Sequence, residues 1–166
     1  MPPPLPVCHL AMPVLADFLY LAHNMREDER EHWCALRAAL AYDPERAALG
    51  FATAPGPTWT LLHADGLPLF AGGFEPVRPG VYAAWAIGTS AAWVDHWRRI
   101  TAACNRVIRR LLADDAHRIE ITTLASRAAA HEWYCRGLRM QPEGQRRGYF
   151  ADGQDGASFA ITRGRA

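Results

Sequence analysis

The sequence predicts one α/β (α+β) domain with a mixed, mostly antiparallel central sheet flanked by helices. Residues 58–87 contain three strand-like segments separated by turn signals, and residues 91–112 contain the longest amphipathic helical pattern. The chain has 166 residues, half of them hydrophobic, which suits one domain that buries about two-thirds of its unfolded surface. We expect residues 1–12 to form a Pro-rich arm and a first strand, and residues 13–166 to form the domain.

Four elements are expected before the three strands. They are a strand over 7–12 and helices over 14–23, 25–36 and 44–49. Asp43 and Pro44 are typical of a helix start, and Gly50 is typical of a residue just past a helix end. The second of these helices carries many charges, which we expect on a solvated face.

The three central strands are predicted over 58–63, 67–74 and 81–87. The turn signal Asp65-Gly66 joins the first two strands, and Pro79-Gly80 joins the last two. The pair Gly72-Gly73 lies inside a strand, which indicates a bulge or a close approach of another part of the chain.

The helix predicted over 91–112 has one apolar stripe and one basic stripe. The apolar stripe contains Trp93, Trp97, Ile100, Cys104, Val107 and Leu111. Arg99, Arg106 and Arg110 form the basic stripe, for which a solvated face is the favoured interpretation. A strand over 117–124, a helix from Ser126 to Gly137, and strands over 140–146 and 157–163 complete the prediction.

Charge and cysteine content bear on partners and compartment. The formal charge is +1, from 18 basic and 17 acidic residues, so nothing favours nucleic acid or an anionic membrane. The apolar stretch 10–22 is interrupted by Pro13 and Asp17 and is too short to cross a bilayer. The four cysteines form no CxxC pair, and His131 with Cys135 would supply only two metal ligands, so we expect free thiols, an intracellular protein and no metal.

Five short motifs lie at residues 25–33, 65–73, 85–89, 130–138 and 158–164. In this order they resemble motifs of the GNAT-fold (N-acetyltransferase-like) proteins of short-tailed phages, a family that includes small internal virion proteins. The resemblance covers about residues 14–164 and implies a GNAT fold. It also implies a virion or assembly protein, made in the host cytoplasm and packaged in the virion.

This sequence departs from the pattern of active GNAT enzymes at two places. A glycine-rich loop before the long helix holds the CoA diphosphate in those enzymes, whereas residues 88–94 carry side chains, including that of Trp93. When the later helix is aligned on Gly137, Trp133 occupies the position of the tyrosine that protonates the CoA thiolate, and Ser126 occupies that of an asparagine. Tyr134 is one residue further on, about 100° around the helix, and is expected to point elsewhere.

The resemblance and these departures favour a non-catalytic protein without a cofactor, which binds other virion proteins of the core, portal or tail, or itself. The interface candidates are Trp93, Trp97, Arg99, Arg106 and Arg110. The alternative is an acetyl-CoA-dependent N-acetyltransferase with a diverged cofactor loop, and a host-takeover factor is a third reading. The catalytic candidates of such an enzyme are Glu75, His63 and Tyr134, and its cofactor-binding candidates are Ile87, Gly88, Thr89, Ser126 and Trp133.

Overall fold

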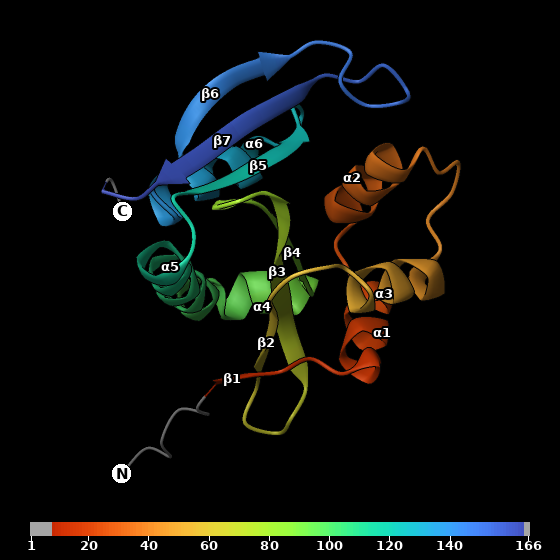
Figure 1. Ribbon diagram of the computed structural model, residues 1–166. Helices are drawn as coiled ribbons and strands as arrows, with labels where there is room; N and C mark the ends of the chain where they lie inside the picture. Colours follow the sequence, from red (N-terminus) through yellow and green to blue (C-terminus); the bar gives the residue numbers. More distant parts are fainter. Residues whose placement is uncertain (1–7, 165–166) are drawn as a thin grey trace.

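The computed structural model describes residues 8–164 and contains one seven-stranded sheet (Figure 1). The strands are β1 (His9–Ala11), β2 (Thr58–Leu62), β3 (Pro68–Arg78), β4 (Val81–Gly88), β5 (Arg118–Leu124), β6 (Gln141–Arg146) and β7 (Gly156–Thr162). Their order is β1-β2-β3-β4-β5-β7-β6, and the neighbours are antiparallel except for β4 and β5. The expected mixed, mostly antiparallel sheet is confirmed; the Pro-rich arm over 1–6 lies outside the described residues.

Helices cover both faces of this sheet. They are α1 (Leu15–His23), α2 (Glu27–Arg37), α3 (Pro44–Ala52), α4 (Ser90–Asp95), α5 (Trp97–Asp114), α6 (Ala128–Glu132) and the π-helical turn η1 (Trp133–Gly137). Phe18 of α1 and Phe51 of α3 pack against Trp85 of β4 on one face. The apolar stripe of α5, with Ile100 and Ile108, packs into the core on the other face. Within residues 8–164, no helix combines the length and the apolar character that crossing a membrane would require.

The sheet is split between its two central strands. β4 and β5 pair in parallel only over Val81–Ala83 and Arg118–Glu120. Beyond Ala83, β4 continues to pair with β3 up to Gly88, while β5 continues to pair with β7 up to Leu124. The two strands therefore diverge, and the opening between them is lined by backbone edges without a strand partner.

Three predicted boundaries are wrong in an informative way. The helix expected over 91–112 is two helices, α4 and α5, because His96 leaves the helical conformation with a φ of −127° and a ψ of 10°. Gly50 does not end α3, which continues to Ala52. Ser126 does not cap α6, which begins after Arg127 without a side-chain cap.

The turn η1 changes the direction of the side chains after α6. The amide of Leu138 donates to the carbonyl of Trp133, five residues earlier, as in a π-helix. An angle of 100° per residue holds only for a regular α-helix, so it does not apply across this turn. Tyr134 lies within it and is 5% exposed. Tyr134 lines the same two cavities as Trp133, so the expectation that its side chain points elsewhere is wrong.

Candidate functional site

Three adjoining cavities lie in and beside the opening between β4 and β5. The tryptophan cavity is lined by Trp93, Trp97 and Trp133. The wide cavity measures about 460 Å³ and lies between α2, α3 and the strands. The apolar cavity lies between the sheet and α5. Ala86 of β4 and Tyr134 of η1 line all three, so the cavities meet at these two residues.

Glu29 of α2 lies between the tryptophan cavity and the wide cavity, and it lines both. Its Oε2 accepts a hydrogen bond from the amide of Gly88 at 3.1 Å, and its Oε1 accepts one from Nε1 of Trp93 at 2.9 Å. Burial raises the pKa of Glu29 to about 7, because the amide of Gly88 and the charge of Arg127 only partly offset the loss of water around the carboxylate. Near neutral pH this group can both accept and release a proton.

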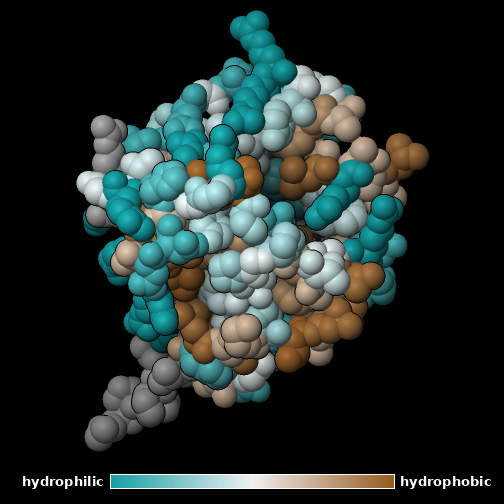
Figure 2. Space-filling model, viewed as in Figure 1, coloured by the Kyte–Doolittle hydropathy of each residue, from teal (hydrophilic) through white to brown (hydrophobic). Residues whose placement is uncertain are grey.

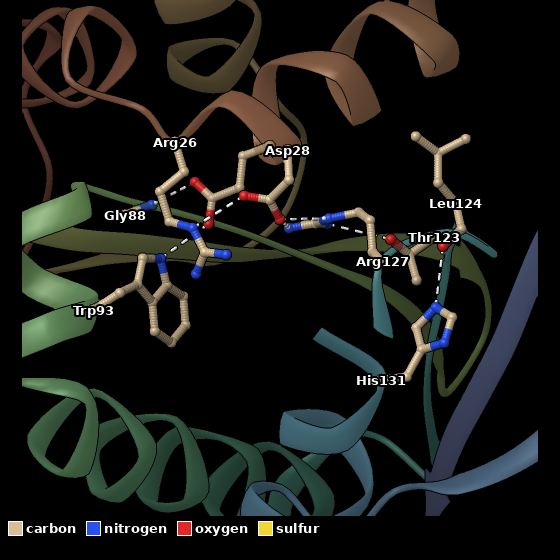
Figure 3. Close-up of polar contacts among 9 residues, drawn as sticks. Arg26, Asp28, Gly88, Trp93, Thr123, Leu124, Arg127 and His131 are labelled. Atoms are coloured by element: carbon tan, nitrogen blue, oxygen red, sulfur yellow. Dashed lines mark hydrogen bonds and ion pairs between the residues drawn. The ribbon is translucent and has the colours of Figure 1, made fainter. Parts of the chain in front are cut away.

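An ion pair connects α2 to the residue before α6 across the opening (Figure 3). Nε and one terminal nitrogen of Arg127 each lie 3.0 Å from Oδ2 of Asp28, and the other terminal nitrogen donates to Thr123 at 3.2 Å. Nε of Arg26 lies 3.0 Å from the other carboxylate oxygen of Asp28. The guanidinium of Arg26 is also 5.7 Å from the ring centre of Trp93. These contacts fix the part of α2 that carries Glu29.

Tyr134 contributes a phenol to the meeting point of the cavities. Its ring packs between Trp133 and Phe159. Burial raises the pKa of the Tyr134 hydroxyl, which is hydrogen-bonded to Thr123. The hydroxyl therefore keeps its proton at neutral pH and can act as a proton donor.

The edge of β4 that faces the opening has main-chain amides available for hydrogen bonding. The amide of Gly88 points into the opening towards Glu29. In an antiparallel strand, residues two apart direct their amides to the same side, so the amide of Ala86 also points into the opening. Ala86 pairs with Gly72 of β3 in register but has no partner in β5. It can therefore donate a hydrogen bond to a bound molecule.

Trp93 closes the end of β4. A Cβ atom on Gly88 would lie 2.8 Å from Nε1 of Trp93, so the indole lies directly against this glycine. The ring also contacts Trp133 edge-on, with centroids 4.9 Å apart, and Nε1 of Trp133 donates to Thr101 at 2.9 Å. This arrangement agrees with the prediction that the side chain of Trp93 occupies the place where active GNAT enzymes present bare backbone to the cofactor.

The structure brings together some of the predicted site residues and separates others. Glu75 and Ile87 line the wide cavity, and Trp133 lines the tryptophan cavity. Thr89 caps α4 through its hydroxyl, which accepts from the amide of Ala92 at 3.0 Å. Ser126 is exposed.

His63 lies apart from this group. It follows β2 at the hairpin, where its Nδ1 is 2.9 Å from Oδ1 of Asp65 and its ring is 5.6 Å from that of His96. It lines none of the three cavities. Of the three predicted catalytic candidates, Glu75 and Tyr134 line the wide cavity, and His63 lies outside it.

The predicted interface residues differ in their exposure. Trp97 is 47% exposed, and the guanidinium of Arg98 lies 5.1 Å from its ring centre. Arg99 is half-buried and contacts Sγ of Cys8 at 3.3 Å, whereas Arg106 and Arg110 are exposed. The basic stripe is therefore only partly on the surface.

The structure also has an apolar surface patch that was not predicted from the sequence. Figure 2 shows apolar residues gathered over α1 and the segment that leads into it. Met12, Val14 and Leu15 are the exposed hydrophobic residues there, at 78%, 59% and 50%. This patch is separate from the cavities, because none of these residues lines them.

Glu29, Asp28 and Arg127 were not among the residues predicted for the site. The solvated face expected for α2 is wrong for Glu29, which is 6% exposed. A signal was present, because Glu29 precedes the buried Trp33 by four residues and so lies on the same helix face. No pattern in the sequence indicated that Arg127 would pair with Asp28, 99 residues away.

Solved structures of acetyltransferases are similar to this chain over nearly its full length. The ribosomal-protein-S18-alanine N-acetyltransferase of Escherichia coli matches with a TM-score of 0.68 at 16% identity, covering 96% of both chains. A GCN5-related N-acetyltransferase of Kribbella flavida matches with a TM-score of 0.66 at 20% identity, covering 93% of this chain and 97% of its own. A Salmonella typhimurium protein assigned as an acetyltransferase, with its cofactor acetyl-CoA, matches with a TM-score of 0.65 at 13% identity, covering 96% and 95%.

These similarities define the class of the fold. The chain has the GNAT fold, with the seven-stranded, mostly antiparallel sheet flanked by helices. No family model and no curated protein matches the sequence. At these identities the likeness concerns the fold, so activity has to be argued from the site itself.

Proposed function

We propose that the protein is an acetyl-CoA-dependent N-acetyltransferase. The observation that supports this most is the position of Glu29, a buried carboxyl with a pKa of about 7 between two cavities that meet at Tyr134. A group that transfers a proton at neutral pH is what acyl transfer to an amine requires. The similar structures add the fold on which this reaction occurs in other proteins.

The tryptophan cavity and the wide cavity suit the two substrates, the acyl-CoA and the amine. The tryptophan cavity, with the free amide of Ala86, would hold the pantetheine arm and the thioester. The wide cavity would hold the amine, because it is the largest of the three, at about 460 Å³, and Glu29 lines it. Glu29 lies between the two, within reach of an amine that approaches the thioester.

Acetyl-CoA supplies the acyl group as a thioester, and the residues of this chain handle the protons. Glu29 takes a proton from the attacking nitrogen as the C–N bond forms. The amide of Ala86 donates to the carbonyl oxygen while negative charge develops on it. Tyr134 would give its proton to the sulfur as the C–S bond breaks and regain one from solvent, and Glu29 would release to solvent the proton that it took from the nitrogen.

The diphosphate requires a different site from the usual glycine-rich loop. Trp93 lies against Gly88, and Glu29 already occupies the amide of that glycine. Arg26 lines the tryptophan cavity beside Trp93 and would supply positive charge instead. The residues present would therefore hold the thioester end of the cofactor, and the side chain of Arg26 would contact its phosphates.

Isothermal titration calorimetry of the purified chain with acetyl-CoA and CoA tests the proposal. We expect one-to-one binding and, with a panel of amines and peptides, acetyl transfer that Glu29→Gln lowers by about 10²-fold or more. Glu31→Gln is the matched control, because Glu31 is an exposed carboxylate on the same helix. Failure to bind either molecule at millimolar concentration would overturn the proposal.

A second candidate is a non-catalytic virion or assembly protein, and the contact of Trp93 with Gly88 and Glu29 favours it. In that case these side chains replace the cofactor, and Trp97 with the patch at Met12, Val14 and Leu15 would bind other virion proteins or a second copy. The assignment to a phage rests on the sequence motifs alone. Mass spectrometry of purified virions, combined with the calorimetry, separates the two candidates.

A further inference from the structure

The apolar cavity extends from the proposed reaction centre into the core. It measures about 40 Å³ and lies on the α5 side of β3 and β4. Gly72, Ala84 and Ala86 form its sheet wall, and Cys104 and Ile108 of α5 face them. Gly72 pairs directly with Ala86, and the indole of Trp59 covers this glycine, so the short side chains of Ala84 and Ala86 leave the space.

The position of this cavity is unusual for a packing defect. Protein interiors leave few voids larger than a water molecule. This one shares Ala86 and Tyr134 with both neighbouring cavities and therefore adjoins the place where the thioester carbonyl would lie. No charged side chain of residues 8–164 lines it. An apolar group attached to the carbonyl carbon would enter it.

We infer that the apolar cavity takes the hydrocarbon chain of an acyl group longer than acetyl, so that the preferred donor is a short-chain acyl-CoA such as butyryl-CoA. The inference rests on the proposed function. A water-sized group needs roughly 10–15 Å³ in the same measure, so the 40 Å³ hold about three such groups. Three carbons beyond the carbonyl correspond to a butyryl chain.

Binding of a donor series tests the inference without relying on turnover. We would titrate the full chain with acetyl-, propionyl-, butyryl- and octanoyl-CoA by calorimetry. Each methylene buried up to butyryl should tighten binding by about fourfold, which gives about 15-fold between acetyl and butyryl. Octanoyl-CoA should bind less tightly than butyryl-CoA, because its chain exceeds the space.

Variants of Cys104 test whether the hydrocarbon chain of the acyl group lies in the apolar cavity. Cys104→Leu fills the cavity and should reduce the preference for butyryl over acetyl to about one, with acetyl-CoA affinity unchanged within about twofold. Cys104→Ala enlarges the cavity and should move the optimum to a longer chain, which keeps the test valid if the leucine variant does not fold. Cys34→Leu is the control, because Cys34 is half-buried and lines none of the three cavities.

The outcomes separate this inference from the proposed function. Acetyl-CoA that binds as tightly as butyryl-CoA would overturn the inference and leave the acetyltransferase proposal intact. A butyryl preference that persists in Cys104→Leu would also overturn it, since the chain would then lie elsewhere. Absence of binding by every acyl-CoA would remove the proposed function and the inference together.

Discussion

Nε1 of Trp93 donates a hydrogen bond to Oε1 of Glu29 at 2.9 Å. This bond connects the wall of the tryptophan cavity, the proposed site of the thioester, to the proposed base. The bond stabilises the charged carboxylate against the cost of burial. Trp93→Phe removes the donor and keeps a ring, so the pKa of Glu29 should rise further from about 7. Loss of a hydrogen bond to a charged group should raise the midpoint of the pH–rate profile by about one pH unit or more.

The matched control for this variant is Trp97→Phe. Trp97 lines the same cavity, is 47% exposed and packs against the guanidinium of Arg98. Its pH–rate profile should coincide with that of the unmodified protein. A midpoint that stays fixed in Trp93→Phe would show that the N–H does not tune this carboxyl.

Stability should depend on pH through two buried groups with opposite effects. Burial raises the pKa of Glu29 to about 7 and lowers that of His32 to about 3. The raised Glu29 stabilises the fold below about pH 4.5, and this contribution is lost as pH rises to about 7. The lowered His32 stabilises the fold above about pH 6.5, and this contribution is lost as pH falls towards 3. Between about pH 4.5 and 6.5 the two slopes should largely cancel.

Single variants should expose each slope in chemical denaturation. In Glu29→Gln the free energy of unfolding should rise with pH across this window, by at most about 1.4 kcal/mol per pH unit. In His32→Gln it should fall with pH by a comparable amount. Equal pH dependence in both variants would contradict the assignment of these two groups.

The phenol of Tyr134 should affect the chemical step more than binding. Tyr134→Phe removes the proposed acid, so kcat should fall by about 10²-fold while KM for the donor changes little. Tyr20→Phe is the control, since Tyr20 is 38% exposed on α1 and away from the cavities. Equal kcat values for the two variants would exclude Tyr134 from proton transfer.

The pair Asp28–Arg127 should hold α2 in place. Arg127→Met retains much of the apolar stem but removes the bonds to Asp28 and Thr123, and should lower the free energy of unfolding by about 1–3 kcal/mol. Thermal and chemical denaturation measure this change. Arg136→Met provides the comparison, because the Arg136–Glu132 pair is exposed and should contribute less than about 1 kcal/mol.

Local sequence patterns were sufficient for most of the elements. Periodicity placed the strands, and Asp43 with Pro44 placed the start of α3, where the carboxylate accepts from the amide of Arg46. These features depend on neighbours in sequence. The break at His96 and the π turn at Trp133 depend on tertiary packing and were missed. An apolar stripe can continue through a change in backbone conformation, so it gave no sign of either.

The site was less predictable than the fold, because its contacts are long-range. Glu29 meets Gly88 and Trp93, 59 and 64 residues away. A charged segment such as 25–36 usually lies in solvent, and only the shared face with Trp33 distinguished Glu29 from Glu31. Tyr134 was expected to point elsewhere because regular α-helical geometry was assumed, whereas it lines all three cavities.

The short pairing of β4 with β5 has a mechanical consequence. Three residues of each strand form that pairing, whereas the pairings of β3 with β4 and of β5 with β7 extend along the strands. The sheet thus has two parts, β1–β4 and β5–β7, whose main-chain pairing is limited to Val81–Ala83 and Arg118–Glu120 (Figure 1). The width of the opening therefore depends on side-chain contacts more than on main-chain pairing, and the Asp28–Arg127 ion pair, which spans the opening, acts as a brace across it.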